Sequence, residues 1–159
     1  MPSSLLFDIS NIDLDQTAVP ADEIPRYNPQ VGDMRQLDHV IWLNDDLSCG
    51  LGVKHVRDDE FWVAGHIPGR PLLPGVLMIE AAAQLSSVLY LLRMDTAMDK
   101  FLGFTRCDSC VFRGQVVPGD VLYLLVKEKK FGERRFSCEA QGLVDGKIVF
   151  EVIITGMRI

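Results

Sequence analysis

A histidine in a proline-rich loop has the surroundings that acid–base chemistry needs. His66 lies in the segment 61–75, which also contains Pro68, Pro71 and Pro74. Each proline fixes its own φ and biases the preceding residue toward extended geometry, so we expect a stiff loop. A stiff loop that presents one imidazole can hold a general base in place. The alternative is that His66 is an ordinary loop residue.

A glutamate follows on the one long helix that the sequence predicts, over residues 76–94. Glu80, Gln84 and Ser87 are spaced i, i+4 and i+7, which places them on one narrow polar stripe of an apolar helix. A carboxylate there is partly desolvated, which favours its protonated form. We therefore predict Glu80 as the general acid and His66 as the base. In the alternative interpretation, Glu80 faces solvent or makes a polar contact in the core, and Gln84 and Ser87 are structural.

The start of this helix is a candidate site for a developing negative charge. Pro74-Gly75 precedes the helix, and its first amides, from Gly75 to Met78, have no acceptor within the helix. Because Gly75 has no Cβ, a carbonyl oxygen can approach closely. Such amides would stabilise a thioester enolate.

The remaining pattern predicts an α+β domain in which an antiparallel sheet wraps the long helix. Asp145-Gly146 between two alternating runs is a strong hairpin signal. The helix is too apolar to lie on a solvated face, so the sheet must cover it. Exposed sheet edges and an uncovered outer face favour dimerisation. The predicted strands span residues 37–43, 49–56, 101–116, 121–130, 134–144 and 147–158.

Composition and charge exclude several classes of function. Hydrophobic residues make up 48% of the 159 residues and charged ones 24%, as in ordinary globular domains. Five of the acidic side chains that give the net charge of −6 precede the first basic residue, Arg26. We expect residues 1–25 to be an acidic extension, with one short helix near 5–9, and residues 26–159 to be a single domain. The near-neutral body gives no indication of nucleic-acid binding or a polybasic membrane patch.

The cysteines and the start of the chain indicate a cytoplasmic protein. No basic-then-apolar stretch resembles a signal peptide, and four cysteines are then most simply free thiols. Polar residues within the long helix argue against a membrane span. Cys107 and Cys110 have the spacing of a zinc half-site, but no second pair exists. If this segment is a strand, positions three apart point to opposite faces. We predict neither a metal nor an organic cofactor.

The segment 61–84 resembles the β-hydroxyacyl-acyl-carrier-protein dehydratases of bacterial fatty-acid synthesis. Their Gly-His-Phe-Pro-Gly loop reads Gly65-His66-Ile67-Pro68-Gly69 here, and their Pro-Gly-Val helix start reads Pro74-Gly75-Val76. Their Glu-Ala-x-Ala-Gln reads Glu80-Ala81-Ala82-Ala83-Gln84, and a later Val-Pro-Gly-Asp is intact at 117–120. The family's Pro-His-Arg element reads Pro29-Gln30-Val31, and its loop Phe is Ile67. These two positions lie near the substrate tunnel of the family, so they bear on which acyl group is accepted.

The resemblance implies a hotdog fold and the removal of water from (3R)-3-hydroxyacyl thioesters to give trans-2-enoyl products. It implies that His66 takes the C2 proton, that Glu80 protonates the departing hydroxyl, and that the Gly75 amide polarises the thioester carbonyl. It also implies a homodimer, often within a trimer of dimers, with His66 and Glu80 contributed by different subunits. The acyl group would be carried by acyl-carrier protein or coenzyme A. The substrate contacts that we predict are Phe61, Ile67, Pro74, Gly75, Val76 and Gln84.

The sequence is compatible with two other functions. One is a hotdog acyl-thioesterase, although such enzymes generally lack this histidine loop. The other is a non-catalytic module that binds an acyl group or its carrier. Both leave the His66/Glu80 pair without a role. The basic residues of the hairpin at 127–135 are candidates for receiving an acidic carrier protein, although they also fit a solvated hairpin.

Overall fold

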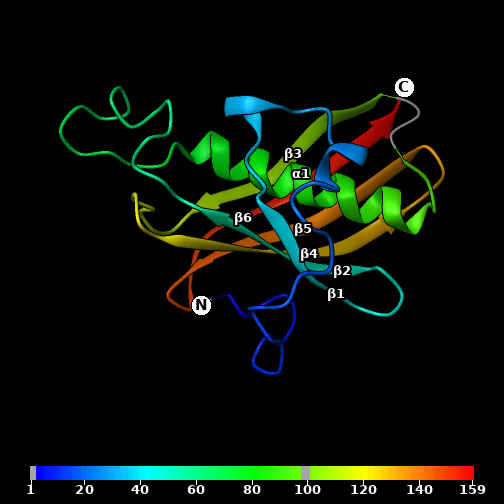
Figure 1. Ribbon diagram of the computed structural model, residues 1–159. Coiled ribbons are helices and arrows are strands. Elements are labelled where there is room, and N and C mark those ends of the chain that lie inside the picture. The colour runs from blue at the N-terminus through cyan, green and yellow to red at the C-terminus, as the bar shows by residue number, and fades with distance from the viewer. Residues whose placement is uncertain (1–2, 98–100) are drawn as a thin grey trace.

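The fold is a six-stranded antiparallel sheet wrapped around a single long helix (Figure 1). The computed structural model describes residues 3–97 and 101–159. Neighbouring strands follow the order β1-β2-β4-β5-β6-β3, so β1 and β3 are the edges. This is the hotdog arrangement expected from the sequence. The elements are β1 (His39–Leu43), β2 (Cys49–His55), α1 (Gly75–Arg93), β3 (Leu102–Phe112), β4 (Val121–Phe131), β5 (Arg135–Val144) and β6 (Lys147–Arg158), with short 3-10 helices at Ile24–Arg26 and Gly32–Met34.

The main core lies between α1 and the concave face of the sheet. Leu85, Val88 and Leu89 of α1 are at most 1% exposed and belong to the same apolar cluster as alternate residues of β4, β5 and β6. By length and hydropathy, α1 is the one helix in the described part of the chain that could cross a membrane. Its burial against the sheet accounts for this apolar character.

Most of the predicted elements agree with the structure to within two residues. The hairpin between β5 and β6 turns at Asp145 and Gly146, whose φ values of 49° and 72° are both positive, as a two-residue type I′ turn requires. The predicted strand at 101–116 is too long, because β3 ends at Phe112. Beyond it the chain turns so that the Val116 carbonyl accepts the Leu73 N–H, at 2.8 Å.

The N-terminal segment contains no helix at residues 5–9, which corrects the sequence prediction. The side chains of Asp8 and Asp13 accept hydrogen bonds from backbone N–H groups two residues further on, and such local bonds compete with helix formation. The segment lies on the outer face of the sheet, away from α1 (Figure 1). Leu6, Phe7, Ile9 and Ile12 pack there against a second apolar cluster. The outer face, which we expected to need a partner, is thus partly covered by the chain itself.

The two edges of the sheet differ. Val40 of β1 exchanges backbone hydrogen bonds of 3.0 and 3.1 Å with Val19, so the N-terminal segment covers the β1 edge. Among the described residues no segment pairs with the outer side of β3. The β3 edge also carries exposed Phe104, Val111 and Phe112. It is therefore the edge available to another chain.

Candidate active site

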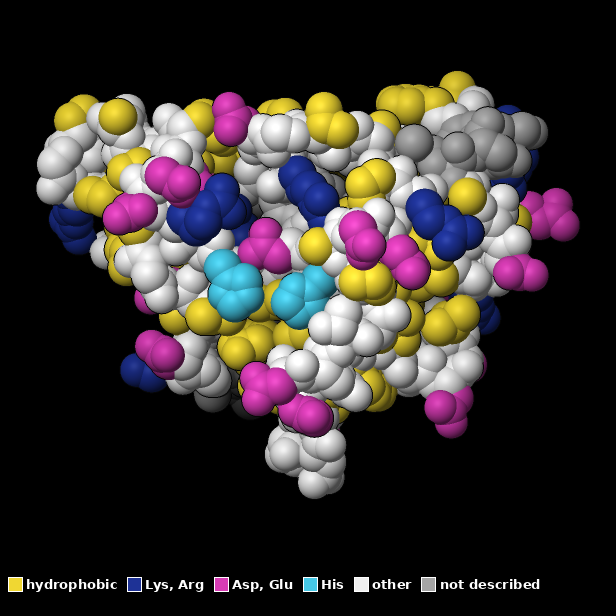
Figure 2. Space-filling model, in the orientation of Figure 1, with side chains coloured by type: hydrophobic (Ala, Val, Ile, Leu, Met, Phe, Trp, Pro, Cys, Tyr) yellow, Lys and Arg dark blue, Asp and Glu magenta, His cyan; other side chains and the backbone are white. Residues whose placement is uncertain are grey.

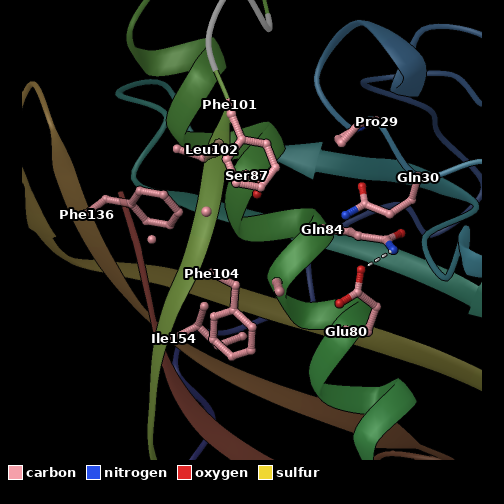
Figure 3. A pocket seen from close by; sticks show the side chains of 13 residues that line it. Pro29, Gln30, Glu80, Gln84, Ser87, Phe101, Leu102, Phe104, Phe136 and Ile154 are labelled. Atoms are coloured by element: carbon pink, nitrogen blue, oxygen red, sulfur yellow. Dashed lines mark hydrogen bonds between the residues drawn. The ribbon is translucent and has the colours of Figure 1, made fainter. Parts of the chain in front are cut away.

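A cavity of about 190 Å³ lies between α1 and β3, under the segment that leads into the second 3-10 helix (Figure 3). Glu80 and Gln84 of α1 lie at one side, together with Gln30, and an apolar wall faces them. The cavity thus has a polar side that can bind a reacting group and an apolar side that can accept a hydrocarbon chain. The apolar wall consists of Phe101, Leu102, Phe104, Phe136 and Ile154.

Glu80 is held by Gln84, whose side chain uses every hydrogen bond that it can make. Gln84 Nε2 donates to Glu80 Oε1 at 2.8 Å and to the Met34 carbonyl at 2.7 Å. Gln84 Oε1 accepts the N–H groups of Gln36 and Leu37, at 2.9 and 3.1 Å. The side chain is 1% exposed and has no unused hydrogen-bond donor or acceptor for a ligand. Gln84 lines the cavity as predicted, but its contacts are those of a residue that positions Glu80 and fixes the 34–37 segment.

The start of α1 retains free amides, though fewer than the sequence predicted. The N–H groups of Leu77 and Met78 donate to the Pro74 carbonyl, at 2.9 and 3.4 Å. Those of Gly75 and Val76 have no acceptor among the described residues. A Cβ on Gly75 would lie 2.6 Å from the ring of Phe112. The absence of a side chain is thus required by packing against β3, in addition to any close approach of a ligand.

The His66 loop is fastened at its base by hydrogen bonds. His66 N–H donates to the Trp62 carbonyl at 2.8 Å, and Leu72 N–H donates to the His66 carbonyl at 3.1 Å. The His66 Nδ1 atom lies 2.7 Å from the Leu72 carbonyl oxygen. Because a carbonyl can only accept, Nδ1 carries the hydrogen and the neutral ring leaves Nε2 free to take a proton. The ring itself is exposed.

Within one chain, the structure does not bring the two predicted catalytic residues into one cavity. The described residues that line the cavity include Glu80 but not His66, and the loop projects beyond the start of α1 (Figure 1). Of the predicted substrate contacts, only Gln84 lines it. Phe61, Ile67 and Val76 are instead exposed by 53%, 48% and 70% on and beside the loop. The remaining two, Pro74 and Gly75, are partly buried where the loop enters α1.

Several cavity residues were missing from the sequence prediction. Phe101 and Phe104 lie on the approach to β3 and on β3 itself, far along the chain from Glu80, and no local pattern links them to it. The sequence indicated Gln30 only because it departs from the family's Pro-His-Arg element. The Gln30 side-chain oxygen is buried and has no partner within the described chain, so it is available to a ligand.

The structure corrects the prediction that Cys107 and Cys110 point to opposite faces of a strand. A bulge between Asp108 and Val111, with Ser109 at φ 50°, shifts the register of β3. Cys107 is paired with Ile154 of the main core, and Cys110 packs against the same core, so both point to the concave face. Burial, and then the neighbouring Cys107 thiol, raise the pKa of Cys110. No group of three or more side chains suited to a metal occurs in residues 3–97 and 101–159.

The other two histidines of the chain, His39 and His55, are neighbours. The rings of His39 and His55 lie 6.5 Å apart, since β1 and β2 pair with His39 opposite Val53. Burial, opposed by Asp38, lowers the pKa of His39, and the nearby His55 lowers it further.

On the face seen in Figure 2, acidic and basic side chains are interspersed, without a broad patch of one sign.

The fold and the cavity define a hotdog protein with a carboxylate at the polar side of a partly apolar cavity. The chain belongs to the FabA-like domain family, which matches residues 28–153. It is 33% identical over 144 residues to the 3-hydroxyacyl-acyl-carrier-protein dehydratase FabZ of Bartonella quintana, covering 89% of this chain and 91% of that one. It is 37% identical to the FabZ of Herpetosiphon aurantiacus over 115 residues, covering 72% of this chain and 80% of that one.

Among solved structures, the fold is similar to the dehydratase heterocomplex ApeI:P from Xenorhabdus doucetiae. The TM-score is 0.72 at 19% sequence identity, over 86% of this chain and 90% of the other. At this identity the similarity shows a common fold.

Proposed function

We propose that the protein is a hydro-lyase that dehydrates (3R)-3-hydroxyacyl thioesters carried by acyl-carrier protein, in fatty-acid synthesis. The observation that carries the proposal is the fixed imidazole of His66, whose Nδ1–H is bonded to Leu72 and whose Nε2 is free. A base in this state needs an acid opposite it, and Glu80 is the carboxylate of the cavity. The FabZ relatives support the choice of substrate and carrier.

In the proposed reaction, His66 Nε2 removes the C2 proton while a protonated Glu80 gives its proton to the 3-hydroxyl. The C3–O bond breaks, water leaves, and the C2=C3 double bond forms. The free Gly75 and Val76 amides lie at the positive end of α1, where they can stabilise the charge that develops on the thioester oxygen. The apolar wall of the cavity receives the acyl chain. This scheme requires neither a metal nor an organic cofactor.

We further propose that the site forms across a homodimer. His66 lies on a loop that projects away from its own cavity, and the β3 edge is unpaired in the described chain and carries exposed aromatic side chains. A partner that packs at this edge can bring its His66 loop to the Glu80 cavity. Exposed Phe61, Ile67 and Val76 would then be covered and could contact substrate. A trimer of dimers is the alternative assembly, and sizing by light scattering distinguishes it from a dimer.

A basic groove on the outer face is the proposed receiving surface for the acidic carrier. Lys129, Lys130 and Arg135 of the β4–β5 hairpin line it together with Arg106 of β3. Lys129 is also bonded to Glu139 at 3.1 Å, and Arg106 to Asp108 at 2.6 Å, so part of this charge is neutralised. The four free cysteines support a reducing, cytoplasmic location. We retain residues 1–25 as an extension and 26–159 as the catalytic domain.

The test is hydration of crotonyl thioesters, followed as loss of enoyl absorbance, for wild type, His66→Ala and Glu80→Gln. The proposal predicts an active wild type and a loss on the order of 10²-fold or more for each variant. Thiol release without hydration would indicate a thioesterase instead. An inactive wild type, on carrier-protein and coenzyme A substrates of several chain lengths, would favour a binding module.

A further inference from the structure

A buried ion pair lies at the base of the His66 loop. Lys54 of β2 and Glu60 of the loop are joined at 2.9 Å, and their side chains are only 2% and 5% exposed. The Glu60 carboxylate also accepts the Trp62 indole N–H and the Arg57 backbone N–H, each at 2.9 Å. Three donors therefore converge on one buried carboxylate.

Stability alone does not explain this arrangement. Removing two charges from water costs about as much as their attraction returns, and apolar side chains of similar volume often serve a fold as well. Burial raises the pKa of Glu60, but the bonds from Arg57, Lys54 and Trp62 outweigh it and leave the pKa lowered. The carboxylate is thus kept charged, and what it supplies is geometry.

That geometry leads directly to the proposed catalytic base. Glu60 fixes the indole of Trp62, which is 3% exposed within the main core. The Trp62 carbonyl accepts the N–H groups of Gly65 and His66, at 3.2 and 2.8 Å. A continuous set of bonds therefore runs from β2 through Glu60 and Trp62 to the His66 backbone. The imidazole itself is exposed in the single chain, so its placement depends on the backbone beneath it.

We infer that Lys54 and Glu60 are positioning residues for His66, which anchor its loop to the sheet and so fix where the imidazole meets substrate. The inference rests on the proposed function for its catalytic consequence. A displacement of about 1 Å at a reacting group can reduce a rate by on the order of 10²-fold. Loss of the anchor is therefore expected to lower kcat, with little change in KM.

The experiment compares wild type with Glu60→Gln and with the double variant Lys54→Met/Glu60→Gln. Glu60→Gln leaves Lys54 buried without a counter-charge and is at risk of unfolding. The double variant leaves no buried charge and keeps similar volume, so it remains foldable. Asp59→Asn, which removes the carboxylate of the exposed Arg57 pair next to Glu60, is the matched control.

Two readouts are recorded for each variant that folds. The first is kcat and KM for hydration, which we expect to show a 10- to 100-fold lower kcat with KM within about twofold. The second is the ring-nitrogen NMR signal of His66, assigned among the three histidines with His66→Ala. Wild type and the control should show one Nδ1-protonated tautomer, and the double variant a mixture of tautomers.

The two readouts separate this inference from the proposed function. A folded double variant with wild-type kcat and an unchanged His66 tautomer would overturn the positioning role. An inactive wild type would refute the dehydratase proposal, while the tautomer comparison would still decide whether the ion pair positions His66.

Discussion

Replacement of Gln84 by methionine tests whether this one amide holds both Glu80 and the 34–37 segment. Gln84→Met keeps the length of the side chain but leaves the N–H groups of Gln36 and Leu37 without an acceptor. These two residues are 1% and 0% exposed, so water cannot replace the lost bonds. Each unsatisfied group costs about 1–3 kcal/mol, so the two together give a loss of about 2–6 kcal/mol in the free energy of unfolding. For a chain of this size, where 1 kcal/mol shifts Tm by about 2–4 °C, Tm is then expected to fall by roughly 4–24 °C.

The assay is urea unfolding followed by tryptophan fluorescence, at a fixed protein concentration because assembly affects apparent stability. Ser87→Ala removes a hydroxyl from the wall of the same cavity and is expected to change stability by less than about 0.5 kcal/mol. Activity of Gln84→Met should also fall, since Glu80 loses the donor at its Oε1. A stability loss below about 1 kcal/mol would refute the structural role of the amide.

Three further outcomes are expected. Burial raises the pKa of Cys138 to about 12, so a thiol reagent should label exposed Cys107 in the native protein and Cys138 only after unfolding; equal labelling rates, measured by mass spectrometry, would contradict this. Deletion of residues 3–15 should uncover the outer apolar cluster and increase dye binding and light scattering, whereas unchanged signals would show that the cover is dispensable. Because the pKa of Glu60 is lowered, the stability that Glu60 contributes is present above the ordinary pKa of 4.5 and is lost as the pH falls through the lowered pKa. The free energy of unfolding, measured between about pH 3 and 5, should therefore vary with pH more steeply than in the Lys54→Met/Glu60→Gln variant.

The regular part of the fold could be predicted because each element has a local signature. Alternating strands, the Asp145-Gly146 turn and the apolar run after Pro74-Gly75 gave bounds close to those observed. The proximity of the His39 and His55 rings follows from the β1–β2 register, which a pattern of single strands does not contain. The bulge at Ser109 could not be predicted from the sequence, because it depends on one non-glycine residue with a positive φ.

The candidate site was predictable only where its residues are close in sequence. The loop of His66 and the helix of Glu80 carry local signals, namely closely spaced prolines and a polar stripe. The cavity depends on Phe101 and Phe104, which reach Glu80 only because β3 lies at the edge next to β6. The outer face was expected to need a partner, yet the irregular N-terminal segment covers part of it. Such a segment has no period from which its position can be predicted.

The central claim is that one active site takes His66 from one subunit and Glu80 from the other. The most direct test mixes the inactive His66→Ala and Glu80→Gln proteins, after reversible dissociation, and measures hydration. Random reassembly makes about half of the dimers hybrid, each with one intact site of two, so about one quarter of wild-type activity should return. Recovery at that level supports the shared site. No recovery, with hybrid dimers shown to be present by mass spectrometry, would contradict it.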